Sequence, residues 1–142
     1  GADKKVVLHS IGGDKRIGNR YFNPGYSFGG PCFPRDTRAL KMVMDKEDIC
    51  SDLLTATTRY NEVHVEFQTV QLLEKGLDHY VIEDICYKEG STIPIIEESA
   101  KLKIALELVK AGKSVTIKDI KILIDEVRKE YGNLFSYVIK EC

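Results

Sequence analysis

The second half of the chain alternates between two hydrophobic periods, and this alternation limits the possible fold more than any other feature of the sequence. Gly76 closes a long helical pattern, and the segments after it fall into two groups. The segments typical of strands are 78–87, 114–118 and 135–139. The segments typical of amphipathic helices are 94–111 and 120–131. This strand–helix–strand–helix–strand order predicts a parallel sheet with right-handed crossovers, because parallel neighbours need a long connection between them.

The first half is helical apart from one long loop. Residues 3–9 read as the end of a helix that is stopped by Gly12 and Gly13. Further helical patterns follow at 35–46 and 48–75. The predicted fold class is therefore α/β, with a helical first part and a strand-containing second part.

The 48–75 pattern carries a continuous apolar stripe. Its members recur every three or four residues and are Ile49, Leu53, Ala56, Tyr60, Val63, Phe67, Val70 and Leu73. Either Asp48 or Ser51 is available as the N-cap of this helix. Such a stripe is expected in a plain core helix or at an interface between chains, and periodicity alone does not separate the two.

The stretch 25–36 holds the residues of most chemical interest. Gly29 and Gly30 lack a Cβ, so they can adopt positive φ and let a ligand approach the backbone. Pro34 is favourable in the first turn of a helix, so Cys32 is expected just before a helix N-terminus. The unpaired amide donors and the dipole there favour a thiolate over a thiol. The alternative is a buried and inert cysteine.

This stretch resembles the catalytic loop of the UDP-glucose/GDP-mannose dehydrogenase family, which reads approximately GFGGxCxxKD. Residues 27–36 read SFGGPCFPRD, with Arg35 where the family usually has lysine. Upstream, residues 14–19 read DKRIGN and are similar to the DxRIG segment of the family. The spacing from Arg16 to Cys32 also fits, so two motifs stand in register.

The resemblance implies how the chain is divided. Residues 1–76 would form the central helical region, which carries the catalytic loop and makes a homodimer. Residues 77–142 would form an incomplete, Rossmann-like domain that binds the nucleotide sugar. In this second part only Lys88 matches the family pattern well enough to be named as a substrate contact. The sequence departs from that pattern at three acidic residues, Glu83, Asp84 and Glu97.

The resemblance also implies a reaction. The complete enzyme would oxidise the C6 alcohol of UDP-glucose to the carboxylate of UDP-glucuronate with NAD, through a thiohemiacetal and a thioester on Cys32. Asp36, one helical turn further on, would orient the hydrolytic water or take its proton, unless it is only a charge at a helix start. The expected substrate contacts are Arg16, Tyr21, Gly25, Gly29 and Lys88.

The cofactor site is expected to lie mainly outside this chain. The sequence has no GxGxxG turn, and neither Gly12-Gly13 nor Gly29-Gly30 has that spacing. The chain alone is therefore expected to be inactive.

Two alternatives remain, a dehydrogenase that acts on GDP-mannose and a non-catalytic module that dimerises and binds a nucleotide sugar. A cysteine hydrolase would need a histidine base near Cys32, and His9 has no recognisable context for that role.

Composition excludes several classes of partner. The formal net charge is −1 and charged residues make up 30% of the chain, so no strong field points to nucleic acid or an anionic membrane. No apolar run of about 18 residues is present, and a cytoplasmic location is expected. The four cysteines have no CxxC spacing, which argues against a zinc site or a disulfide framework.

Overall fold

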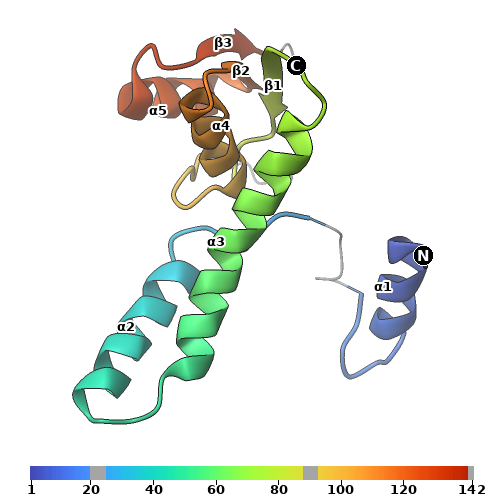
Figure 1. Cartoon of the computed structure of the whole chain (residues 1–142), viewed down its shortest axis with the longest axis vertical. Coiled ribbons are helices and arrows are strands. Elements are labelled where there is room, and N and C mark those ends of the chain that lie inside the picture. The colour runs from blue at the N-terminus through green and yellow to red at the C-terminus, as the bar shows by residue number, and fades with distance from the viewer. Residues whose placement is uncertain (20–24, 88–92, 141–142) are drawn as a thin grey trace.

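Figure 1 shows a computed structural model of the chain, in which residues 1–19, 25–87 and 93–140 are described. The first helix, α1, spans Lys4–Gly12 and stands apart from the other helices. The Asp3 carboxylate caps it by accepting hydrogen bonds from the first backbone amides, and the helix ends with Gly13 as its C-cap. The expected helix that stops at the paired glycines is therefore confirmed.

Helices α2 (Phe33–Lys46) and α3 (Asp52–Leu73) form a hairpin. In Figure 1, α2 lies beside the first half of α3, and the second half of α3 reaches the sheet. The long helix begins four residues later than the 48–75 pattern predicted, because Asp48 takes a left-handed conformation with φ 52°. Ser51 occupies the N-cap position, but its hydroxyl donates to Asp45 and caps no amide.

The strands β1 (His79–Glu83), β2 (Ser114–Asp119) and β3 (Ser136–Ile139) form a parallel sheet in that order. Helix α4 (Ala100–Lys110) joins the first two strands, and α5 (Lys121–Tyr131) joins the last two. The alternation read from the sequence and the parallel sheet are confirmed.

Two further predicted bounds, in the second half of the chain, are wrong, and both errors also fall at left-handed residues. The strand predicted at 78–87 ends at Glu83, since Asp84 has φ 55°. The helix predicted from 94 begins only at Ala100, because the chain turns at Glu98, which has φ 54°. Ser99 then caps α4 by accepting a hydrogen bond from a backbone amide of its first turn.

The hydrophobic core lies between β2 and the two connecting helices. Six side chains in it are almost fully buried: Ile85, Ile104, Leu108, Ile117, Ile124 and Val127. Helix α3 also contributes, since Val65 belongs to this core and Leu72 and Leu73 pack against it. The long helix thus packs against α4 and ties the α2–α3 hairpin to the core of the second half.

Most of the apolar stripe on α3 faces solvent in the single chain. Leu53 is 79% exposed, Tyr60 73% and Phe67 57%. Only one side of α3, at Val65 and Thr69, is buried in the core. The exposed stripe therefore favours the interface over the plain core helix.

Candidate functional site

Cys32 lies at the start of α2, as the sequence predicted. It is the N-cap residue of that helix and is exposed, and Pro34 is buried in the first turn. The Cys32 carbonyl accepts the Asp36 backbone amide at 2.8 Å, which closes the first helical turn. The side chain therefore stands at the positive end of the helix dipole, open to an incoming group.

Asp36 forms an ion pair with Arg35. The Arg35 Nε donates to Asp36 Oδ1 at 2.8 Å, and both side chains are exposed. The hydrogen bond and the charge of Asp36 raise the pKa of Arg35, and the nearby Cys32 adds a smaller effect in the same direction. The guanidinium is thus a fixed positive charge beside both predicted catalytic residues.

The paired glycines before Cys32 let two parts of the chain meet. A Cβ on Gly29 would lie 2.2 Å from the Glu98 carbonyl oxygen, and one on Gly30 would lie 2.5 Å from the Tyr87 ring. Gly30 also has φ 81°, and its amide donates to the Glu97 carbonyl at 3.1 Å. The space beside Gly29 is thus taken by the turn that precedes α4, and the space beside Gly30 by the Tyr87 ring.

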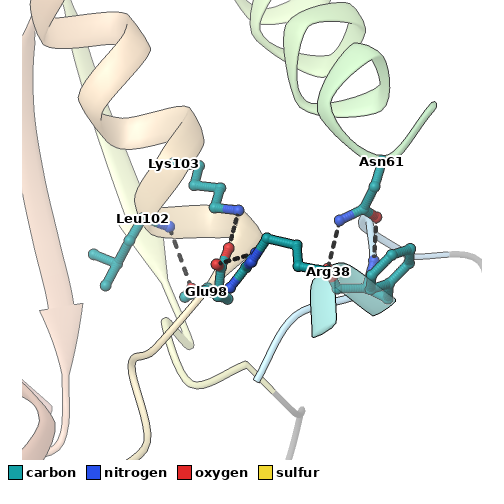
Figure 2. Close-up of polar contacts among 7 residues, drawn as sticks. Arg38, Asn61, Glu98, Leu102 and Lys103 are labelled. Atoms are coloured by element: carbon teal, nitrogen blue, oxygen red, sulfur yellow. Dashed lines mark hydrogen bonds and ion pairs between the residues drawn. The ribbon is translucent and has the colours of Figure 1, made fainter. Parts of the chain in front are cut away.

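Glu98 links that turn to α2. Figure 2 shows its carboxylate between Arg38, whose Nη1 donates to Oε1 at 2.9 Å, and the Lys103 ammonium, which contacts the other oxygen. Burial opposes ionisation of Glu98, but the hydrogen bonds and charges of Lys103 and Arg38 outweigh it and hold the pKa of this carboxyl below its usual range. One carboxylate therefore joins α2 to α4.

Helix α3 holds the other end of the loop that precedes Cys32. The Asn61 side chain accepts the Phe28 amide and donates to the Phe28 carbonyl, both at 2.8 Å (Figure 2). One turn and two turns further along α3, His64 and Gln68 reach the Gly25 carbonyl at 3.5 and 3.3 Å. These side chains fix the backbone of the loop on α3.

An open groove of about 600 Å³ runs between this loop and α3. It is lined by Tyr26, Ser27, Phe28, Ala56, Thr57, Tyr60, Asn61 and His64. Within the part of the chain that the structure describes, no three His, Cys, Asp or Glu side chains are placed to share a metal ion. The described helices also include none that is long and apolar enough to cross a membrane.

Comparison with known proteins shows which family the sequence matches. The model of the UDP-glucose/GDP-mannose dehydrogenase family, central domain, matches residues 1–63, which include the Cys32 loop and the start of α3. The chain belongs to this dehydrogenase family. The motifs at 14–19 and 27–36, which first suggested the resemblance, both lie within the matched residues.

Relatives and solved structures extend the similarity to the second half. UDP-glucose 6-dehydrogenase of Rickettsia prowazekii is 35% identical over 154 residues, covering 100% of this chain and 34% of that protein. The protein of the same name from Campylobacter jejuni is 30% identical over 151 residues, covering 95% and 38%. A UDP-glucose dehydrogenase structure from Pyrobaculum islandicum aligns with TM-score 0.85 at 30% identity, over 99% of this chain and 33% of that one. The chain thus spans about a third of the length of these relatives.

The structure does not bring all predicted substrate contacts of this dehydrogenase family member together. Arg16 lies in the turn after α1 and pairs with Asp14 at 2.6 Å, and α1 stands apart from α2 in Figure 1. That hydrogen bond raises the pKa of Arg16 and lowers the pKa of Asp14. Gly25 and Gly29 lie in the loop before Cys32, as described above. Tyr21 and Lys88 fall outside the described residues.

Two of the three acidic residues that depart from the family pattern form ion pairs at the carboxyl ends of the strands. Glu83 contacts Lys118 at 2.9 Å, and Asp84 contacts Lys140 at 2.7 Å. These hydrogen bonds lower the pKa of both carboxyls. The third acidic departure, Glu97, is exposed, and its carbonyl binds the loop through the Gly30 amide.

Sequence reasoning missed Asn61, Arg38 and Glu98. One signal was available for Asn61, because asparagine is a poor residue for the interior of a helix and usually has a specific hydrogen-bonding reason to be there. Nothing in the sequence marks Arg38 and Glu98 as partners, since they are separated by 60 residues.

Proposed function

We propose that this chain is the part of a nucleotide-sugar dehydrogenase that carries the covalent nucleophile, Cys32, and that the nucleotide sugar is UDP-glucose. The observation that carries the proposal is an exposed cysteine at a helix N-terminus, within residues that match the central domain of the family. The relatives named above are UDP-glucose dehydrogenases, which favours UDP-glucose over GDP-mannose.

The covalent step that this chain supplies is the addition of the Cys32 sulfur to the C6 aldehyde. The thiol loses its proton to water, the sulfur electron pair forms the C–S bond, the carbonyl electron pair moves to oxygen, and that oxygen takes a proton from water to give a thiohemiacetal. The positive charge of Arg35 and the amides at the start of α2 would stabilise the negative charge that forms on this oxygen after attack. Asp36 lies one helical turn away and would orient the water that hydrolyses the later thioester.

The described residues do not fit a dinucleotide cofactor. β1 runs into Asp84 and Ile85, and β2 runs into Ile120, so neither of these strands leads into a glycine turn that could receive a pyrophosphate. The family implies NAD, and we propose that NAD is bound by polypeptide other than these residues. The homodimer and the predicted division at 76/77 belong to the same proposal.

A second candidate function is a non-catalytic module that binds a nucleotide sugar. The acidic residues at the strand ends favour it over the dehydrogenase, because Glu83 and Asp84 pair with Lys118 and Lys140 and make this half of the chain depart from the pattern of a working dehydrogenase. The two candidates differ in whether a product forms, which makes turnover the deciding measurement.

The first prediction concerns turnover by the protein that contains this chain. With UDP-glucose and NAD we expect UDP-glucuronate and two NADH for each sugar oxidised, because the alcohol is taken to the carboxylate. Product analysis by chromatography and NADH absorbance gives the stoichiometry. Binding of UDP-glucose without any NADH would support the non-catalytic module, and preferred oxidation of GDP-mannose would correct the substrate.

The second prediction concerns the apolar stripe on α3. We expect the chain to form a homodimer at micromolar concentration, because Leu53, Tyr60 and Phe67 leave a large apolar surface uncovered. Phe67→Asp places a charge on the stripe and should shift sedimentation toward the monomer. Thr55→Asp is the matched control, since it adds the same charge to α3 outside the stripe. A wild-type chain that sediments as a monomer contradicts the interface.

A further inference from the structure

We propose that Asn61 is a positioning residue for Cys32. Its side chain makes two hydrogen bonds of 2.8 Å with the same residue, Phe28, accepting from the amide and donating to the carbonyl. A planar carboxamide bound at both ends fixes the position of that residue and also its orientation. This inference rests on the proposed function, because it assigns Asn61 to the chemistry of Cys32.

Helix propensity does not explain why asparagine occupies position 61. Asn61 is in the middle of α3, where an asparagine side chain competes for backbone hydrogen bonds and lowers helix propensity. Its contacts with Phe28 bridge 33 residues of sequence and are half-buried. Both polar ends of the side chain are thereby used outside the helix, in a place where water competes less strongly.

The position of Phe28 affects Cys32 because the loop between them is held by further contacts. Between Phe28 and Cys32, Gly29 lies against the Glu98 backbone and the Gly30 amide donates to the Glu97 carbonyl. The Phe28 ring also meets the Phe33 ring edge to face, with 6.5 Å between centroids. Contacts through Phe28 therefore hold the residues on both sides of Cys32 in place relative to α3. Asn61 provides the hydrogen bonds between α3 and Phe28.

The positioning role is tested by substitutions that keep the approximate size of the Asn61 side chain and remove its hydrogen bonds. Asn61→Leu removes both bonds with Phe28. Asn61→Asp keeps the acceptor for the Phe28 amide but replaces the donor to the Phe28 carbonyl with a second acceptor. Gln71→Leu is the matched control, because Gln71 is an exposed amide on the same helix and bonds to Glu74.

The measurements are steady-state kinetics and amide hydrogen exchange on the protein that contains this chain. For Asn61→Leu we expect kcat to fall about 100-fold, since misplacing a reacting group by about 1 Å has an effect of that size. KM for UDP-glucose should stay within about twofold of the wild type, because a positioning residue acts on the reacting geometry. Exchange in peptides covering 25–33 should accelerate. Asn61→Asp should fall between Asn61→Leu and the wild type in both readouts.

The outcomes separate this inference from the proposed function. If Cys32 is essential and Asn61→Leu keeps kcat at the level of Gln71→Leu, the positioning role is wrong. If kcat falls while exchange at 25–33 stays at the wild-type rate, Asn61 does not act through the loop and the inference is also overturned. Normal turnover of Cys32→Ser would instead overturn the proposed function, and with it the catalytic meaning of Asn61.

Discussion

Replacing Cys32 with serine is expected to lower turnover by about three orders of magnitude or more in the protein that contains this chain. Serine keeps nearly the same size, so the start of α2 should keep its shape. A serine hydroxyl is far harder to ionise than a thiol and is a poor nucleophile without an adjacent base. The two charged side chains that follow Cys32 in the first turn of α2 are the Arg35 cation and the Asp36 carboxylate that it holds, and neither is a neutral base of the kind that activates a serine.

Binding should survive this substitution. The expected contacts of UDP-glucose are Arg16, Tyr21, Lys88 and the backbone at Gly25 and Gly29, and none of them needs the sulfur atom. The dissociation constant of UDP-glucose, measured by calorimetry, should therefore stay close to the wild-type value. A large loss of binding together with the loss of turnover would mean that the loop had been displaced, and the covalent role would not be supported.

Two other cysteines serve as controls for the covalent role. Cys50 is exposed, and Cys86 is half-buried with its Sγ directed at the Ile93 carbonyl. Cys50→Ser and Cys86→Ser should change turnover by no more than a modest packing effect. Alkylation followed by peptide mapping should find Cys32 protected when UDP-glucose is bound. Normal turnover of Cys32→Ser, or protection of Cys50 in its place, would contradict the assignment.

The order of helices and strands could be predicted because it depends on local patterns. Apolar periodicity marked α4, α5 and the strands, and the parallel pairing follows from their alternation. The errors at element ends share one physical cause. Asp48, Asp84 and Glu98 take left-handed conformations without being glycine, so the usual glycine signal for a turn was missing.

The candidate site was predictable only where its determinants are close in sequence. Cys32 could be placed at a helix start because Pro34 and the glycines lie within a few residues of it. The contacts that hold the loop, between Phe28 and Asn61 and between Arg38 and Glu98, join distant parts of the chain. Such pairs depend on how α2, α3 and α4 pack, and no single-sequence pattern encodes that arrangement.

The same long-range packing makes Gly29 the second position where a large effect is expected. Gly29→Ala should destabilise the chain by about 1–3 kcal/mol, the usual range for an overpacked site. The added Cβ would lie 2.2 Å from the Glu98 carbonyl oxygen and 3.1 Å from its carbonyl carbon, and both are backbone atoms. Gly29, unlike Gly30, is not in the left-handed region, so the effect reports steric overlap alone.

Glu98 has little freedom to move away from an added methyl group. Its carboxylate is held by Arg38 and Lys103, and the next residue caps α4. The loop must therefore shift in place of the turn, which would carry Cys32 with it and lower turnover as well as stability. Gly13→Ala is the control, because Gly13 has ordinary helical φ and its nearest atom is 3.3 Å away. Urea denaturation gives both free energies of unfolding, and equal stability of the two variants would show that the turn at Glu98 does not confine the loop.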